Sequence, residues 1–126
     1  MKFERKFFKC LVCGNIVAKI EDSGVKVHCC GQEMAELVAN TTDASQEKHV
    51  PVATRNGDQL LVTVGAAPHP MIPEHHISWI CIAQEHKTQR VTLEPTGEPE
   101  GIFDVEGELT VYAYCNLHGL WAADVN

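Results

Sequence analysis

Histidine and cysteine side chains recur at three separated places in the chain. His49 lies two residues before a proline, His69 stands between two prolines, and Cys115 and His118 share a C-x2-H segment followed by Gly119. Proline restricts the backbone around the first two residues, and glycine allows a sharp return after the last two. Imidazole nitrogen and thiolate sulfur suit redox-active transition metals better than calcium or magnesium. We therefore interpret these residues as one metal site.

The adjacent His75 and His76 offer one more imidazole. Neighbouring side chains of an extended chain point to opposite faces, so only one of the two is expected to bind the metal. The residues alone do not choose between them. Four nitrogens and one sulfur would leave one octahedral position open, and chemistry on a small molecule could take place there.

Four more thiols lie between residues 10 and 30. Cys10 and Cys13 form a C-x2-C turn, and the adjacent Cys29 and Cys30 complete a set of four. We expect a four-thiolate metal site, distorted from tetrahedral because adjacent side chains must open the angle between their two sulfurs. The spacing does not separate iron from zinc. The sixth thiol, Cys81, lies in an apolar run and is expected to be buried and free.

Two regions that differ in pattern must position these residues. Alternating stretches at residues 16–20 and 25–27 predict a small hairpin in a segment that is too short for its own core and needs a metal staple. After a polar connector at 41–46, short β-type runs recur, and they predict a mainly β, sandwich-like fold. These runs are residues 50–53, 60–64, 77–83, 90–93 and 109–114.

Composition excludes several classes of protein. With 44% hydrophobic and 21% charged residues, the chain of 126 is typical of a soluble globular protein. The net charge of −7 argues against general nucleic-acid binding, which needs a basic surface. No run reaches the roughly 18 apolar residues of a membrane span, and the first ten residues contain no signal-peptide hydrophobic region. We therefore expect a cytoplasmic protein that binds neither nucleic acid nor membrane.

The segment from residue 1 to about 36 resembles desulforedoxin, a rubredoxin-like module with one iron in four cysteines. The adjacent Cys29 and Cys30 carry much of this likeness. The resemblance implies iron at Cys10, Cys13, Cys29 and Cys30, and it implies a homodimer because the family's module dimerises.

Three further motifs resemble the signatures of superoxide reductase. They are Glu47-Lys48-His49-Val50-Pro51, His69-Pro70-Met71-x3-His75, and Cys115-Asn116-Leu117-His118-Gly119. With the cysteine module in front, the whole chain is similar to the two-iron form, the desulfoferrodoxins. The resemblance implies a desulforedoxin-like domain at 1–37 and an immunoglobulin-like β-sandwich at 38–126. It also implies iron bound by His49, His69, His75, His118 and, axially, Cys115.

The same resemblance implies an activity and assigns roles to two neighbours of His49. The expected enzyme detoxifies superoxide by reducing it with one electron to hydrogen peroxide, without producing oxygen, and an external donor of the rubredoxin type re-reduces it. Lys48 would attract superoxide and organise proton delivery, and Glu47 would be the sixth ligand of the oxidised iron. The chain departs from the family pattern mainly at Ile72-Pro73-Glu74 and at Cys81.

Two other readings of the residues are open at this point. A blue-copper electron carrier also combines a β-sandwich with cysteine and histidine ligands, although it needs only two histidines and no methionine follows His118. The second alternative is a purely structural zinc protein, which would leave Glu47 and Lys48 without a role.

Overall fold

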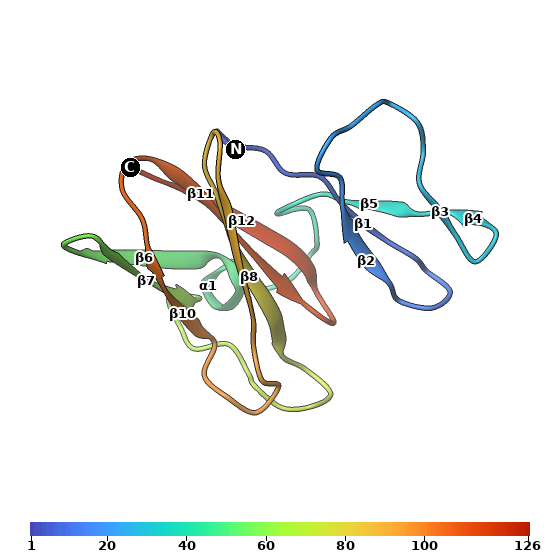
Figure 1. Ribbon diagram of the computed structural model, residues 1–126. Coiled ribbons are helices and arrows are strands. Elements are labelled where there is room, and N and C mark those ends of the chain that lie inside the picture. Colours follow the sequence, from blue (N-terminus) through green and yellow to red (C-terminus); the bar gives the residue numbers. More distant parts are fainter. The chain divides into compact units, whose positions relative to one another are not determined.

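The computed structural model describes residues 1–126 and divides them into two compact units. The small unit is Arg5–Val38, and the large unit combines Met1–Glu4 with Ala39–Asn126. Both are built almost wholly from β-strands, so the predicted mainly β fold is confirmed (Figure 1). No helix has the length and apolar character needed to cross a membrane.

The small unit contains two short sheets. One has the order β2-β1-β5 and the other pairs β3 with β4. Their bounds are β1 Phe7–Lys9, β2 Ile16–Ala18, β3 His28–Cys29, β4 Gln32–Glu33 and β5 Ala35–Leu37. Only Phe7, Cys10 and Met34 are buried hydrophobic residues in this unit. So small a core supports the expectation that a bound metal stabilises the unit.

The predicted hairpin between residues 16–20 and 25–27 is wrong. Strand β2 pairs with β1 instead, and residues 25–27 form no strand. The physical reason lies at Asp22, whose carboxylate accepts hydrogen bonds from Gly24 N–H at 2.8 Å and from Lys19 Nζ at 2.9 Å. Lys19 Nζ also donates to Val25 O, so local polar contacts fold this segment into a loop.

The large unit is a sandwich of two antiparallel sheets (Figure 1). The first sheet has the order β10-β7-β6 and the second has the order β12-β11-β8-β9. Their bounds are β6 Pro51–Asn56, β7 Gln59–Val64, β8 Ile77–Ala83, β9 Thr88–Thr92, β10 Glu100–Asp104, β11 Leu109–Cys115 and β12 Gly119–Val125. The predicted runs correspond to β6, β7, β8, β9 and β11, with ends that differ by a few residues.

The sandwich core is drawn from the inner faces of both sheets. In β7, Leu60, Val62 and Val64 are fully buried while the residues between them are exposed or half-buried, which is the period of two expected for a strand. Every residue of β11 is buried, including Cys115 at its end. A ligand at the end of the best-buried strand is therefore held on a rigid element.

Strand β10 was not predicted because Gly101 was interpreted as a separator between strands. In the structure Gly101 pairs with Val62 inside the sheet. A Cβ at this position would lie 3.0 Å from the Phe103 ring and 3.2 Å from Val91 Cγ1. The glycine therefore makes room for neighbouring side chains within a strand and does not end one.

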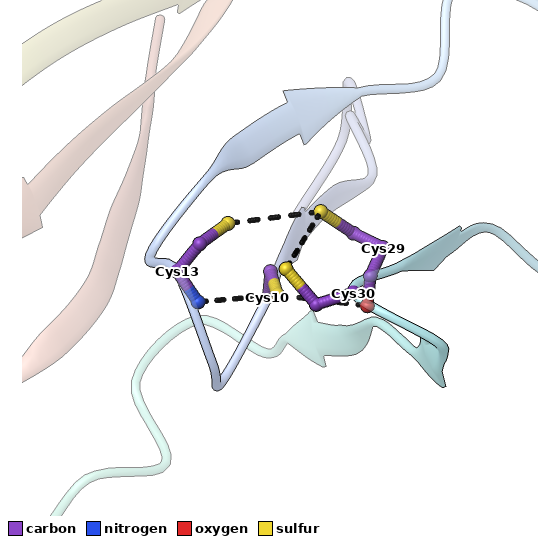
Figure 2. A group of neighbouring side chains, drawn as sticks. All are labelled: Cys10, Cys13, Cys29 and Cys30. Carbon is purple, nitrogen blue, oxygen red and sulfur yellow. Dashed lines mark hydrogen bonds between the residues drawn. The ribbon is translucent and has the colours of Figure 1, made fainter.

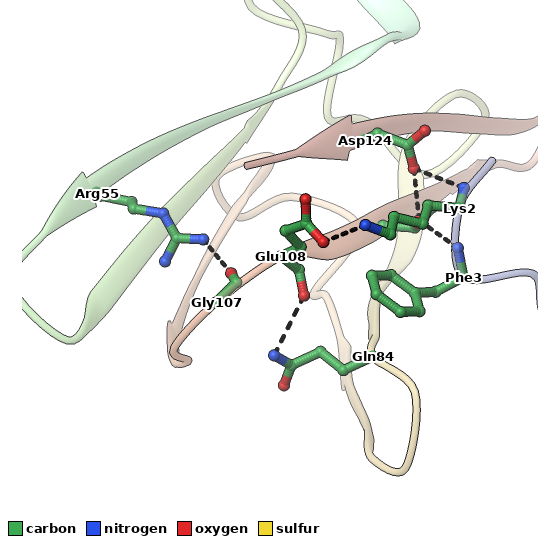
Figure 3. A network of polar contacts seen from close by, with 8 residues as sticks. Lys2, Phe3, Arg55, Gln84, Gly107, Glu108 and Asp124 are labelled. Carbon is green, nitrogen blue, oxygen red and sulfur yellow. Dashed lines mark hydrogen bonds and ion pairs between the residues drawn. The ribbon is translucent and has the colours of Figure 1, made fainter.

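The first residues of the chain are attached to β11 and β12 (Figure 3). Lys2 N–H donates to Asp124 Oδ1 at 3.0 Å, and Phe3 N–H donates to Thr110 Oγ1 at 3.0 Å. Tyr112 Oη donates to Phe3 O at 3.2 Å. The contacts place Met1–Glu4 with the large unit, although these residues precede the small unit in sequence.

Candidate metal centres

The five residues predicted for the second metal all lie at one end of the sandwich. His49 ends the single-turn helix α1 (Gln46–His49) just before β6, and His69 and His75 lie in the connection from β7 to β8. Cys115 ends β11, and His118 lies in the turn to β12 that Gly119 closes with a φ of 79°. Antiparallel strands that begin or end at the same edge thus bring together residues that are distant in sequence.

Helix α1 was not predicted, and it places the first motif. Val50 N–H donates to Gln46 O at 2.9 Å, and Pro51 then disfavours further helix, so Val50 is extended. The single turn buries His49 to 3% exposure while Glu47 and Lys48 remain exposed. A histidine and two charged neighbours are thereby presented at the same end of the sandwich.

The four imidazole rings form a square. Around it, the ring centroids of neighbours are 4.6 Å apart for His49–His69 and His69–His75, 4.9 Å for His75–His118 and 4.8 Å for His49–His118. Each ring is nearly perpendicular to both neighbours, with angles between 75° and 89°. His49 and His75 are 6.3 Å apart and 28° from parallel, as expected across a diagonal. Four imidazoles arranged in such a square could bind one metal ion between them.

The ring nitrogens that face one another require a cation between them. His49 Nδ1 lies 2.6 Å from Ser45 O and His69 Nδ1 lies 2.7 Å from Pro70 O, so in the neutral rings each Nδ1 carries the proton. Both Nε2 atoms then present lone pairs at 3.1 Å from each other. His118 Nδ1 is 3.0 Å from His49 Nε2. Metal–nitrogen bonds of about 2.1 Å at right angles place two nitrogens about 3.0 Å apart, so the cluster fits a metal.

Burial prepares these groups for a metal. Burial lowers the pKa of His49 and His75, and it lowers the pKa of His69 to about 4, so these rings are neutral at pH 7. Burial raises the pKa of the Cys115 thiol, although the backbone N–H groups of His118 and Leu117 favour its thiolate. A bound cation would supply the remaining charge that a buried thiolate needs.

The structure distinguishes His75 from His76. His75 Nε2 is buried with no hydrogen-bond partner, and it lies with the ligand atoms of His49, His69 and Cys115, all within 4.8 Å of one another. The ring of His76 faces away, and its Nδ1 lies 3.1 Å from both Ile72 O and Pro73 O. A buried nitrogen without a hydrogen-bond partner, lying among other ligand atoms, is suited to bind a metal.

Glu47 and Lys48 lie beside this cluster with free side chains. Neither makes a hydrogen bond or an ion pair through its charged group. The positive charge of Lys48 contributes to lowering the pKa of His49 and of His75, which places it within electrostatic reach of the site. Cys81 is 1% exposed and forms no disulfide, so its predicted burial as a thiol outside any disulfide is confirmed.

The four cysteines of the small unit form a second cluster (Figure 2). The sulfurs of Cys13 and Cys29 are 3.7 Å apart and those of Cys29 and Cys30 are 4.0 Å apart. Four sulfurs at about 2.3 Å from a tetrahedral metal would be about 3.8 Å apart, so the cluster fits one ion. The wider spacing of the adjacent pair agrees with the expected opening of its angle.

Adjacent cysteines reach the same point because of a tight turn. Cys29 pairs with Gln32, and the two residues between them, Cys30 and Gly31, have φ values of 54° and 73°. Two left-handed residues joining paired strands are typical of a type I′ hairpin turn. The turn places the Cys30 sulfur 4.0 Å from that of Cys29 and within the four-cysteine cluster.

The thiols of this cluster have different affinities for protons. Hydrogen bonds from the backbone N–H groups of Cys13 and Val12 lower the pKa of Cys10 to about 6. Contacts with Cys13 and Cys10 raise the pKa of Cys30 to about 12. Crowded thiolates repel one another, and a cation bound among them would offset this repulsion.

Sequence profiles of known families match both parts of the chain. The desulfoferrodoxin profile matches residues 41–124, and the profile of the desulfoferrodoxin N-terminal domain matches residues 4–37. The chain belongs to the desulfoferrodoxin family. Its tetracysteine cluster and its four-histidine, one-cysteine cluster are the two iron centres of that family, so the chain binds two iron ions. This excludes the blue-copper interpretation.

Individual relatives are similar to this chain over most of their length. The chain is 46% identical to the desulfoferrodoxin of Clostridium acetobutylicum, with 89% of this chain and 90% of the relative covered. It is 37% identical to the desulfoferrodoxin of Nitratidesulfovibrio vulgaris, with 98% of this chain and 99% of the relative covered. The superoxide reductase of Treponema pallidum is similar in structure, with a TM-score of 0.78, 32% identity, and 95% and 98% of the two chains covered.

Two residues that are not ligands support the iron site. Trp121 stacks on His49 with ring centroids 4.9 Å apart, and its Nε1 donates to His118 O at 3.1 Å. Gly65 packs against α1, where an added Cβ would lie 2.5 Å from Glu47 O. A glycine without a left-handed φ carries no local signal, because only the packing of a distant helix requires it.

Proposed function

We propose that this protein is a superoxide reductase. The convergence of four imidazoles and one cysteine sulfur on a single point carries the proposal, because five ligands leave one octahedral position open. The ferrous iron supplies the electron that, together with two protons, converts superoxide to hydrogen peroxide. The superoxide reductases of Treponema pallidum and Giardia intestinalis, 32% and 31% identical to this chain, support the assignment.

Lys48 and Glu47, which lie beside the ligand His49 in sequence, would assist the reaction. The Lys48 ammonium is exposed and unpaired, so its charge is available to attract an anion to a protein with a net charge of −7. Its hydrogens can also donate to a bound anion and organise water for protonation. The Glu47 carboxylate is equally free, and it would be the sixth ligand when the iron is oxidised.

The decisive experiment measures products. The iron-loaded, fully reduced protein is mixed anaerobically with a pulse of superoxide, and peroxide, oxygen and the iron oxidation state are measured. We expect one peroxide for each catalytic iron oxidised, with no oxygen evolved. Oxygen as a major product would indicate dismutation, and a preparation that binds only zinc in an active form would exclude this chemistry.

Lys48→Ala tests the role of the lysine. One charge about 4 Å from an anion in water contributes roughly 1 kcal/mol, so capture of superoxide should slow about fivefold. Added salt should reduce the difference, because it screens exposed charges. Lys87→Ala is the matched control, since it removes the same charge beyond the far end of β8. Equal rates for the two variants would remove Lys48 from the mechanism.

We further propose a homodimer that receives electrons from a rubredoxin-type donor in the cytoplasm. Exposed apolar side chains on the small unit support a second copy as partner: Ile20 is 98% exposed and Leu11 is 73% exposed. Sedimentation should give the mass of two chains, and Ile20→Lys should lower it to one. The donor assignment rests on the family, and reduced rubredoxin should re-reduce the oxidised protein within seconds.

A further inference from the structure

One iron ligand differs from the others in how its ring is held. The rings of His49 and His69 are fixed by Nδ1 contacts to backbone carbonyls, and His118 lies in a tight turn. No such contact is seen for His75, whose buried Nε2 has no hydrogen-bond partner. The position of the His75 ring therefore depends on the backbone of its own loop. Contacts from another part of the chain must hold that loop in place.

Asn116 provides this attachment. Its side-chain Oδ1 accepts from His76 N–H at 2.9 Å, and its Nδ2 donates to Glu74 O at 3.0 Å. Its backbone N–H donates to His76 O at 3.2 Å. Three hydrogen bonds thus hold the two residues that flank His75 in sequence.

The hydrogen bonds of Asn116 lie where the regular ladder between β8 and β11 is interrupted. Tyr114 pairs with Trp79 but Cys115 pairs with Ile77, so β8 has one extra residue, Ser78, at this point. Beyond such a bulge the regular pairing of β8 with β11 is disturbed. The Asn116 side chain takes the place of a backbone carbonyl and continues the contact by one more residue, to His76.

We propose that Asn116 is the positioning residue that sets His75 relative to the thiolate of Cys115. Asn116 directly follows Cys115, so its three hydrogen bonds connect Cys115 to the two residues that flank His75. Side chains that orient metal ligands typically change metal affinity 10- to 100-fold when they are removed. The proposal rests on the iron site and not on the reaction with superoxide, so metal binding tests it separately.

The test compares Asn116→Ala with Gln84→Ala. Gln84 is the matched control because its amide also donates to backbone carbonyls, of Glu106 and Glu108, near the other end of β8. We expect Asn116→Ala to weaken ferrous iron binding at the histidine site at least tenfold in chelator competition, and Gln84→Ala to leave it unchanged. The sulfur-to-iron charge-transfer absorption of the oxidised form should also shift only in Asn116→Ala.

A His75→Ala background separates positioning from general stability. If Asn116 acts through His75, adding Asn116→Ala to His75→Ala should not weaken iron binding further. Asn116→Asp keeps the acceptor for His76 N–H and loses the donor to Glu74 O, so its iron affinity should be intermediate. Wild-type affinity in Asn116→Ala or Asn116→Asp, or an equal further loss in the His75→Ala background, would overturn the proposal.

Discussion

Replacing Gly65 by alanine should disturb the iron site from outside it. Gly65 N–H donates to Ala67 O at 3.2 Å, and Ala67 N–H donates to Glu47 O at 3.1 Å, so the loop after β7 is held against α1. A Cβ on Gly65 would lie 2.5 Å from Glu47 O, 2.8 Å from Lys48 C and 3.0 Å from His49 N. All three are backbone atoms, which cannot rotate away as a flexible side chain would.

The size of the effect follows from these distances. Ordinary contact begins at 3.4 Å, so the loop and helix must separate by nearly an ångström. Overpacking of this kind lowers the free energy of unfolding by about 1–3 kcal/mol. We expect a loss near the upper end of this range, because no side chain can move aside. Metal–ligand distances tolerate only about 0.2 Å, so displacement of His49 should also weaken iron binding at least tenfold.

The assay uses a second glycine as its control. A Cβ on Gly97 would lie 3.4 Å from Glu94 O and 3.5 Å from Glu94 Cβ, which is ordinary contact. Gly97→Ala should therefore leave the free energy of unfolding and the affinity for iron near the wild-type values. Urea unfolding of the iron-free protein gives the stability, and chelator competition gives the affinity. If Gly65→Ala and Gly97→Ala behave alike in both measurements, the close packing on α1 has no role in holding the ligand.

Two further predictions concern contacts away from the histidine site. Ion pairs with Lys19 and Lys6 hold the pKa of the Asp22 carboxyl well below its ordinary value of 3.8. The stability they contribute is present above pH 3.8 and is lost as the pH falls through the lower pKa; a carboxyl chemical-shift titration with a midpoint at or above 3.8 would contradict this. Thr110→Val removes the acceptor of Phe3 N–H and should lower the free energy of unfolding by about 2 kcal/mol. It should also speed hydrogen exchange at Phe3, and unchanged exchange would show that the first residues are held by other contacts.

Much of the large unit was predictable because its pattern is local. Alternation of apolar residues identified β7, and a continuous apolar run identified β8, since burial on one face or both imposes these patterns on a strand. The failures occurred where a distant contact decided the conformation. Strand β10 contains a glycine that only its neighbours explain, and the segment after β2 follows the Asp22 contacts and does not form a hairpin.

The sequence by itself determined the chemistry of the two iron centres. Thiols and imidazoles bind transition metals wherever a fold gathers them, and motif order identified His75 through resemblance to a family. The tertiary structure decided how these groups meet: a square of rings, ring nitrogens 3.0–3.1 Å apart, and a buried His75 Nε2 without a hydrogen-bond partner. It also decided which residues hold them, because Gly65 and Asn116 act across gaps in sequence that only folding closes.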